Sequence, residues 1–145
     1  MSEIRSATEA DLSYLATLCA GEPEAVWNAV TLGAEIKNAV NKVWVLERPA
    51  HGIVALLVFS QVLDEIEIQY LITHRACRRQ GLAQSLLAHL ISFARQQKIG
   101  RLLLELRQSN VAAKELYTAS GFLPYGMRQR YYANGEDAVL MEYSV

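Results

Sequence analysis

The chain has 145 residues, enough for one domain with a hydrophobic core and too few for two. Its net charge of −1 excludes a global field that would draw the protein to nucleic acid or to an anionic membrane. Hydrophobic residues make up 52% and charged residues 20%, which is typical of a globular protein rather than a disordered one. We therefore expect a single domain over residues 1–145.

The cysteines and the N-terminus bear on the compartment. Cys19 and Cys77 are far apart and form neither a C-x-x-C nor a metal-ligand spacing, which favours a reducing compartment with free thiols. Charged residues between Glu3 and Asp11 interrupt any apolar run, and no segment is long enough to span a membrane. We expect a cytoplasmic protein with no metal and no membrane or nucleic-acid partner, existing as a monomer or weak dimer.

The first half of the chain predicts a strand, two helical regions and a meander. A strand over 3–7 precedes a helix that Thr8 can cap while Asp11 reaches back to it. A second helical region, over about 24–40, contains Gly33, which we expect to break it. Three strands in an antiparallel meander follow, over 42–47, 53–62 and 65–72.

The stretch Arg78-Arg79-Gln80-Gly81-Leu82-Ala83 lies where the third of these strands gives way to a helix. Downstream, apolar residues recur at helical spacing, at Leu82, Leu86, Leu87, Leu90, Ile91 and Ala94. The first turn of a helix has free N–H groups, the glycine has no Cβ to block a ligand, and two arginines add positive charge. The junction predicts a site for a phosphorylated ligand; the alternative is an ordinary helix start with solvent-facing arginines.

The second half predicts a further strand–helix pair and a final hairpin. The expected elements are a strand over 102–106, a helix from Asn110 to Ser120 ended by Gly121, and strands over 122–127 and 137–143. Asn134-Gly135 predicts a two-residue hairpin turn between the last two strands. This order of elements predicts an α/β fold with a mixed, mostly antiparallel central sheet and helices on both faces.

Three segments resemble a known family. The pattern [RQ]-x-x-G-x-[GA] at 78–83 resembles the pyrophosphate-binding loop of the GNAT superfamily of N-acetyltransferases, and it is neither a P-loop nor a dinucleotide motif. Residues 105–117 with 120–122 resemble the RimI-type ribosomal-protein-alanine N-acetyltransferases. The ending R-x-x-Y-Y…E-D-A at 128–138 resembles the same subgroup. The resemblance covers nearly the whole chain and implies the GNAT fold.

By this resemblance the co-substrate is acetyl-CoA, with no metal. The backbone of the loop from Arg79 to Gln84 would cradle the pyrophosphate, and the preceding strand end would hydrogen-bond the pantetheine arm and polarise the thioester carbonyl. Asn110 is implied as a further contact, although its pattern also fits a helix N-cap. The implied cofactor-binding residues are Leu71, Ile72, Thr73, Arg78, Arg79, Gln80, Gly81, Leu82, Ala83, Gln84 and Asn110.

Two residues are candidates for proton transfer. Glu105 is a carboxylate in an otherwise apolar strand, where burying a charge is costly unless it is paired or used. The resemblance implies that it is the general base, directly or through a water. Tyr117 follows in the next helix and is implied as the general acid toward the CoA thiolate, so we expect both to flank one site. The alternatives are a solvent-facing carboxylate and a core aromatic.

Other side chains near these motifs have weaker interpretations. Tyr131 and Tyr132 precede the expected hairpin turn and, by resemblance, line the acceptor side; cross-strand aromatics are the alternative. Cys77 lies among arginines that can lower a thiol pKa, but no base partner accompanies it, so we expect an exposed bystander. We assign a surface role to His74.

The acceptor amine is the last question. An α-amine has a pKa of about 8 and a lysine amine about 10.4, so one glutamate suits an α-amine better. The resemblance implies the N-terminal alanine of a ribosomal protein, although Val26-Trp27 stands where the family carries proline-tryptophan. The alternatives are a non-catalytic acyl-CoA-binding domain and an enzyme for a polyamine, amino acid or aminoglycoside. The latter would have an acidic groove, for which the candidates are Glu22, Glu24, Glu35, Asp64 and Glu65.

Overall fold

The computed structural model describes residues 2–20, 29–38 and 40–145, and its centre is a seven-stranded sheet ordered β1-β2-β3-β4-β5-β7-β6. The strands are β1 (Glu3–Ser6), β2 (Asn41–Arg48), β3 (Gly52–Val62), β4 (Glu65–Thr73), β5 (Arg101–Arg107), β6 (Leu123–Arg128) and β7 (Ala138–Ser144). The helices are α1 (Leu12–Ala20), α2 (Ala29–Lys37), α3 (Leu82–Gln96) and α4 (Val111–Ala119), with short 3-10 turns at Glu9–Asp11 and Arg75–Cys77. In this part of the chain no helix combines the length and apolar character needed to cross a membrane.

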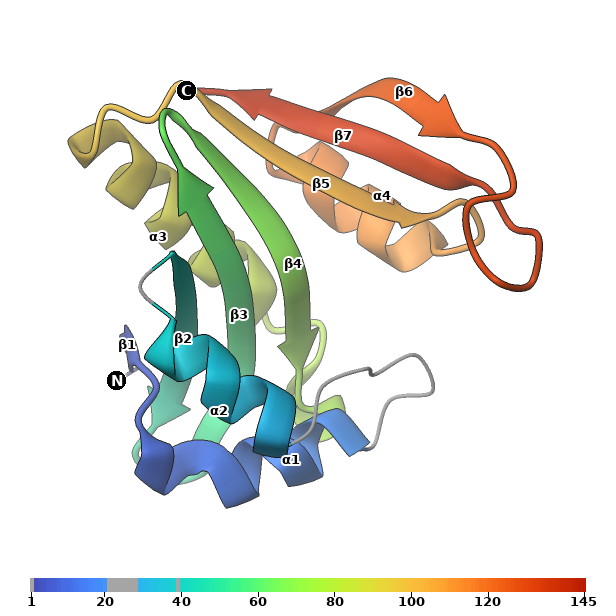
Figure 1. The fold of residues 1–145 in the computed structure, drawn as a ribbon. Coiled ribbons are helices and arrows are strands. Elements are labelled where there is room, and N and C mark those ends of the chain that lie inside the picture. The colour runs from blue at the N-terminus through green and yellow to red at the C-terminus, as the bar shows by residue number, and fades with distance from the viewer. Residues whose placement is uncertain (1, 21–28, 39) are drawn as a thin grey trace.

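Helices cover both faces of the sheet, which confirms the predicted α/β arrangement. α1 and α2 lie on one face, and α3 and α4 lie on the other (Figure 1). Two separate apolar clusters result, because β3 is buried on both sides and sends alternate residues into each. Leu57 and Phe59 join the cluster under α3 and α4, whereas Leu56 and Val58 join the cluster under α1 and α2.

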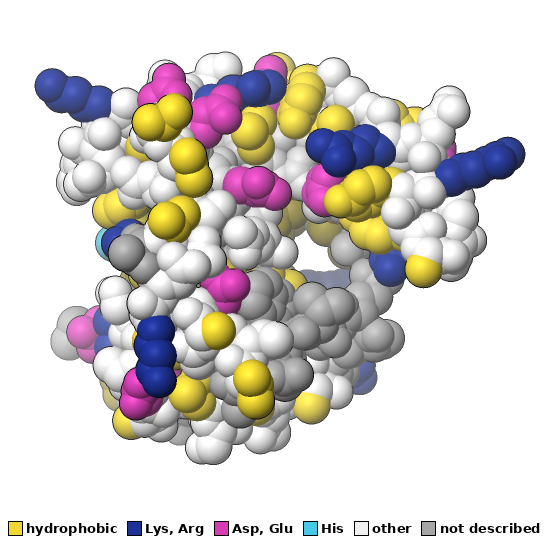
Figure 2. Space-filling view, viewed as in Figure 1, with side chains coloured by type: hydrophobic (Ala, Val, Ile, Leu, Met, Phe, Trp, Pro, Cys, Tyr) yellow, Lys and Arg dark blue, Asp and Glu magenta, His cyan; other side chains and the backbone are white. Residues whose placement is uncertain are grey.

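The sheet is antiparallel except between β4 and β5, which run parallel and are connected through α3. This parallel pairing is short. It consists of Glu65 with Arg101, Ile66 with Leu102, and Glu67 with Leu103. Beyond these pairs the two strands diverge, so the sheet divides into two arms joined at one end (Figure 1). The space-filling view is hollowed between the two arms on the face that carries α1 and α2 (Figure 2).

A β-bulge in β4 lies where the arms separate. Ile68 and Tyr70 pair with consecutive residues of β3, so Gln69 is an extra residue on β4. As a result Ile68 packs under α3 while Ile72 packs under α1 and α2, although even spacing alone would place both on one face. A bulge bends its strand and increases its twist, which is consistent with β4 turning away from β5.

The predicted break at Gly33 is wrong. Residues 24–28 and 39 of the predicted second helical region lie outside the described residues, but α2 runs through Gly33 without interruption. A Cβ at this position would lie 3.4 Å from Leu12 Cδ1. The glycine therefore allows α2 to approach Leu12, at the start of α1, closely.

The predicted two-residue hairpin at Asn134-Gly135 is also wrong. The last β6–β7 pair is Arg128 with Ala138, so residues 129–137 form a longer loop. Within it Gly135 has a φ of +84°, and its N–H donates to the carbonyl of Tyr132 at 2.9 Å. The Asn-Gly pair does make a tight turn, but that turn lies inside the loop and does not join the strands directly.

Strand β6 forms one edge of the sheet. It pairs with β7 alone among the described strands, and its register shifts between Pro124 and Gly126. All six of its residues are exposed, including Leu123, Tyr125 and Met127. This strand was predicted one residue earlier, over 122–127, but Phe122 is fully buried and belongs to the core.

The end of α4 is closed by a Schellman motif that fixes the position of Tyr117. The N–H of Phe122 donates to the carbonyl of Tyr117 at 2.9 Å, and the N–H of Gly121 donates to that of Thr118 at 3.1 Å. Gly121 takes the left-handed conformation that this motif requires, with φ +102°. The rings of Phe122 and Tyr117 then meet edge to face at 5.4 Å.

We expect Gly121→Ala to destabilise the protein by about 2–3 kcal/mol in urea denaturation. The added Cβ would lie 2.8 Å from Tyr143 Cε2, in a conformation that L-residues rarely adopt. Gly135→Ala is the matched control, because its φ is also positive but nothing lies within 4 Å of the added Cβ. It should cost only about 1 kcal/mol. Equal losses in the two variants would show that the contact with Tyr143 is unimportant.

Candidate active site

The loop between β4 and α3 has the backbone geometry of an anion site. Arg79 and Gly81 both have left-handed φ angles, +62° and +77°. Gly81 is the N-cap of α3 and supplies no side-chain cap, and the first helical bond runs from the N–H of Ser85 to the carbonyl of Gly81. The N–H groups of residues 82–84 therefore have no acceptor within the helix. A Cβ at Gly81 would meet nothing within 4 Å, so the approach to these groups is open.

Side chains hold this loop in place from three directions. The Nε of Arg78 donates to the carbonyl of Thr73 at 3.1 Å, which ties the loop to the end of β4. Arg48, in β2, donates to Oε1 of Gln80 at 2.6 Å. His74 is exposed, as predicted, and its Nδ1 accepts from the N–H of Ala76 at 3.1 Å. Sequence reasoning missed Arg48, because nothing in a strand 32 residues earlier indicates this contact.

The prediction that Cys77 is exposed is wrong. Its residue is 5% exposed and packs in the core cluster under α3, together with Leu82 and Leu86. The 3-10 turn at Arg75–Cys77 rotates this side chain inward while the neighbouring arginines face solvent. The thiol is thus part of the packing that supports the loop.

The end of β4 borders the gap between the two arms. Leu71, Ile72 and Thr73 pair with β3 on one side, but the pairing with β5 ends at Glu67. Within the described structure, the edge of β4 that faces β5 therefore has no strand partner beyond Glu67. An extended ligand can use such an edge, because the backbone groups of a strand repeat at the spacing that an added strand would use.

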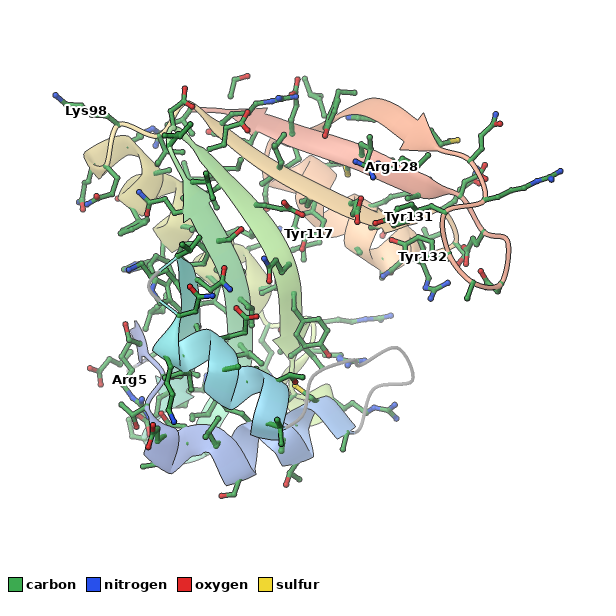
Figure 3. The ribbon with its side chains drawn as sticks, in the orientation of Figure 1. Arg5, Lys98, Tyr117, Arg128, Tyr131 and Tyr132 are labelled. Atoms are coloured by element: carbon green, nitrogen blue, oxygen red, sulfur yellow. The ribbon has the colours of Figure 1, made fainter. Side chains whose placement is uncertain are left out.

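Tyr117 lies in the core beside this gap. Its residue is 7% exposed, and burial raises the pKa of the phenol well above its ordinary value. In Figure 3 the side chain of Tyr117 lies between β4 and β5. Asn110 caps α4 as predicted, because its Oδ1 accepts from the N–H of Ala113 at 3.1 Å.

Glu105 lies on the opposite face of β5 from Tyr117. Leu104 and Leu106 point into the cluster that contains Tyr117, so the alternation of the strand directs Glu105 to the other face. The Glu105 side chain is 31% exposed, and its Oε2 lies 3.9 Å from Nε of Arg128. The two candidate proton-transfer residues therefore lie on opposite faces of β5, beside the part of the strand that no longer pairs with β4.

Tyr131 and Tyr132 come from the long β6–β7 loop and lie beside the end of β5 (Figure 3). A hydrogen bond to the Glu105 carboxylate, together with its negative charge, raises the pKa of Tyr131. The guanidinium of Arg107 lies 4.1 Å from the centre of the Tyr132 ring. The two tyrosine rings meet edge to face at 5.2 Å, so they form a single wall beside Glu105.

The acidic residues of the R-x-x-Y-Y…E-D-A ending anchor this loop. Glu136 accepts from the N–H of Ser109 at 2.7 Å and lies 3.6 Å from the guanidinium of Arg107. Hydrogen bonds from Ser109 are the main reason that the pKa of Glu136 is lowered. Asp137 accepts from the N–H of Arg130 at 2.8 Å. These contacts give the ending a structural role in fixing the two tyrosines.

The expected acidic groove is only partly described. Glu22, Glu24 and the Val26-Trp27 pair lie outside the described residues. Glu65 forms an ion pair with Arg101 at 3.3 Å, so its charge is compensated. Glu67, which sequence reasoning missed, is exposed, and its negative charge reaches Tyr131. The alternation Glu65-Ile66-Glu67-Ile68 could have indicated it, since both glutamates share one face.

Comparison with known proteins identifies the family. The sequence profile of the "Acetyltransferase (GNAT) family" matches residues 12–122, more than half of the chain. The chain belongs to the GNAT acetyltransferase family. GNAT enzymes use acetyl-CoA, and in this chain the loop at 78–84 and the diverging strands β4 and β5 lie within the matched segment.

Curated relatives of this GNAT chain include ribosomal protein bS18-alanine N-acetyltransferases. The protein of Haemophilus ducreyi is 37% identical over 94 residues, which cover 62% of this chain and 65% of the relative. That of Escherichia coli K12 is 37% identical over 90 residues, covering 60% and 61%. The matched segment therefore spans less than two thirds of either relative.

Solved structures agree on the fold. The crystal structure of the ribosomal-protein-S18-alanine N-acetyltransferase from Escherichia coli matches with a TM-score of 0.89 and 28% identity, covering 100% of this chain and 94% of that one. Ard1 from Thermoplasma volcanium matches with a TM-score of 0.85, covering 99% and 97%. At 22% identity, this second likeness supports a shared fold and nothing more.

We expect Gly81→Ala to weaken binding of CoA by about tenfold in calorimetric titration. The substitution strains the loop and places a methyl group where the pyrophosphate would approach, and such strain costs about 1 kcal/mol. Gly52→Ala is the matched control, since Gly52 also has a left-handed φ, +70°, and an open Cβ position. It is the first residue of β3, and its variant should lose similar stability but retain affinity. An equal loss of affinity in both variants would contradict the assignment of this loop.

Proposed function

We propose that this protein transfers the acetyl group of acetyl-CoA to a protein N-terminal α-amine, that of an N-terminal alanine on a ribosomal protein. The observation that carries the proposal is the gap between β4 and β5, which has the uncapped start of α3 at its entrance and Glu105 and Tyr117 on either side of β5. The relatives named above support the choice of acceptor.

The residues around the gap fit acetyl-CoA. The free N–H groups at the start of α3, with Arg78 and Arg79 beside them, suit a pyrophosphate. The unpaired edge of β4 at Leu71, Ile72 and Thr73 suits the amide groups of a pantetheine arm. When bound there, acetyl-CoA supplies an activated thioester carbonyl, which a neutral amine attacks directly.

Two side chains of this chain would move protons. Glu105 is partly exposed on the face where the acceptor wall of Tyr131 and Tyr132 lies, so it can take a proton from the incoming amine, directly or through a water. The phenol of Tyr117 is protonated at neutral pH and would donate its proton to the departing sulfur. Burial raises the pKa of this phenol, so the transfer relies on placement beside the developing thiolate. Because β5 separates the two residues, Glu105 would take its proton on one side of the reacting carbonyl and Tyr117 would donate its proton on the other.

The proton balance favours an α-amine as the acceptor. At neutral pH about a tenth of an α-amine of pKa about 8 is unprotonated, whereas the fraction for a lysine of pKa about 10.4 is hundreds of times smaller. A single partly exposed carboxylate therefore needs to remove a proton from a smaller fraction of the acceptor when the acceptor is an α-amine. Tyr131 and Tyr132 offer aromatic and hydroxyl contacts to the first residues of the acceptor chain.

The test measures CoA release with three acceptors: a peptide with a free N-terminal alanine, the same peptide N-acetylated but carrying a lysine, and spermidine. We expect turnover with the alanine peptide and a loss of about 100-fold or more in Glu105→Gln and in Tyr117→Phe. Matched controls are Glu115→Gln on the exposed face of α4 and Tyr125→Phe on β6, which should retain activity.

Each other outcome has a definite meaning. A preference for spermidine would indicate a small-molecule acetyltransferase. Binding of acetyl-CoA without turnover of any of the three acceptors would contradict the proposed acceptor and favour an acyl-CoA-binding domain. Full activity in Tyr117→Phe would remove Tyr117 from the mechanism without affecting the rest.

A further inference from the structure

Three arginine–tyrosine stacks lie along the sheet face that carries Glu105. The guanidinium-to-ring distances are 4.9 Å for Arg101 and Tyr125, 4.1 Å for Arg107 and Tyr132, and 5.3 Å for Arg128 and Tyr131. All three arginines come from strands, β5 or β6, and each tyrosine comes from β6 or the loop that follows it. In each stack a guanidinium lies against a tyrosine ring, but the three arginines differ in which carboxylates lie near their positive charge.

Arg101 and Arg107 are balanced by structural contacts. Arg101 donates to Glu142 at 2.6 Å and to Glu65 at 3.3 Å. Arg107 donates to Asn134 at 3.3 Å and lies 3.6 Å from Glu136. These contacts join strands and loop, and none of the partners is a candidate for proton transfer.

Arg128 differs because its carboxylate neighbour is Glu105, and within the described residues it has no other. The Nε to Oε2 distance is 3.9 Å, which is short enough for charge attraction but too long for a hydrogen bond. The guanidinium therefore attracts the carboxylate without occupying one of its lone pairs. The Tyr131 ring lies beside the guanidinium, and its hydroxyl hydrogen-bonds the same carboxylate.

We propose that Arg128 is a positioning residue that acts through Glu105, keeping the carboxylate ionised and oriented while leaving it free to take the acceptor's proton. The Tyr131 ring serves as the spacer that holds the guanidinium at charge distance. This inference rests on the proposed function, in which Glu105 is the base.

The other charged groups around Glu105 do not replace Arg128. From β4, Glu67 brings a second negative charge to this face, and a like charge makes a carboxylate easier to protonate. On β5 itself, Arg107 is two residues away and is balanced by Glu136. From β7, the residue opposite Glu105 is the uncharged Leu140. From the β6–β7 loop, Tyr131 contributes a neutral hydroxyl.

The test is the pH dependence of kcat with the alanine peptide in Arg128→Gln. Without the guanidinium, the base takes a solvent proton at higher pH, so the acidic limb of the profile should move upward. We expect kcat to fall about two- to threefold on the acidic limb and to be unchanged on the plateau, with KM changed less than twofold, because a partly exposed charge pair is worth at most about 1 kcal/mol. Arg128→Lys keeps the charge and should recover most of the rate on that limb.

Arg101→Gln is the matched control, because it removes the same charge from an equivalent stack on the same face. It should leave the shape of the profile unchanged. A parallel loss of kcat at all pH values in Arg128→Gln, or an equal shift in Arg101→Gln, would overturn the inference. Failure of Arg128→Lys to recover the rate would also count against it, since the proposed role is one of charge.

A second measurement does not depend on the acceptor. In protein with ¹³C-labelled glutamate carboxyl groups, assigned through Glu105→Gln, a larger protonated fraction of Glu105 at pH 5.5 is expected in Arg128→Gln than in wild type. No difference would overturn the inference even if the wild type acetylates the alanine peptide. If the wild type shows no turnover, the proposed function fails, while this result still decides whether Arg128 acts on Glu105.

Discussion

The parallel pairing between β4 and β5 is the constraint on which the rest of the site depends. Three residue pairs hold the two arms of the sheet together, and the bulge at Gln69 then carries β4 away from β5. The free strand edge, the helix end that follows β4 and the helix that follows β5 all border the same gap. Longer pairing would fill this gap with strand-to-strand hydrogen bonds.

The two sides of the site are supported by different means. On the side of the phosphate loop, buried packing at Cys77 and hydrogen bonds from Arg48 and Arg78 fix the backbone. On the acceptor side, exposed charged side chains and aromatic stacks around Glu136 fix the loop with Tyr131. The first arrangement depends on tertiary packing, whereas the second depends on contacts that solvent and salt can weaken.

Local pattern predicted most of the fold, because alternation in β4 and helical spacing in α3 are properties of single segments. Caps were also predictable, as Asn110 and Gly121 show. The errors arose where a distant partner decides the outcome. α2 continues through Gly33 because Leu12 packs there, and the loop at 129–137 is long because Glu136 binds Ser109 in the segment after β5.

The sequence predicted which residues belong to the candidate site, but it did not predict how they are placed relative to one another. The resemblance indicated Glu105, Tyr117 and the tyrosine pair, yet a linear sequence does not show that β5 separates Glu105 from Tyr117. Arg128 stood in a quoted motif without a role, since its register opposite Ala138 becomes visible only in the sheet. Strand register is set by pairing, and pairing is not a local property.

Strand β6 also bears on whether copies of the protein can pair edge to edge. It is an edge strand with exposed apolar side chains, the kind of surface that recruits another strand and begins aggregation. Pro124 has no backbone N–H to donate, and the register shift before Gly126 interrupts the regular spacing of the strand. Together they make the edge a poor template, so the strand can carry Arg128 to Glu105 without inviting a neighbouring chain.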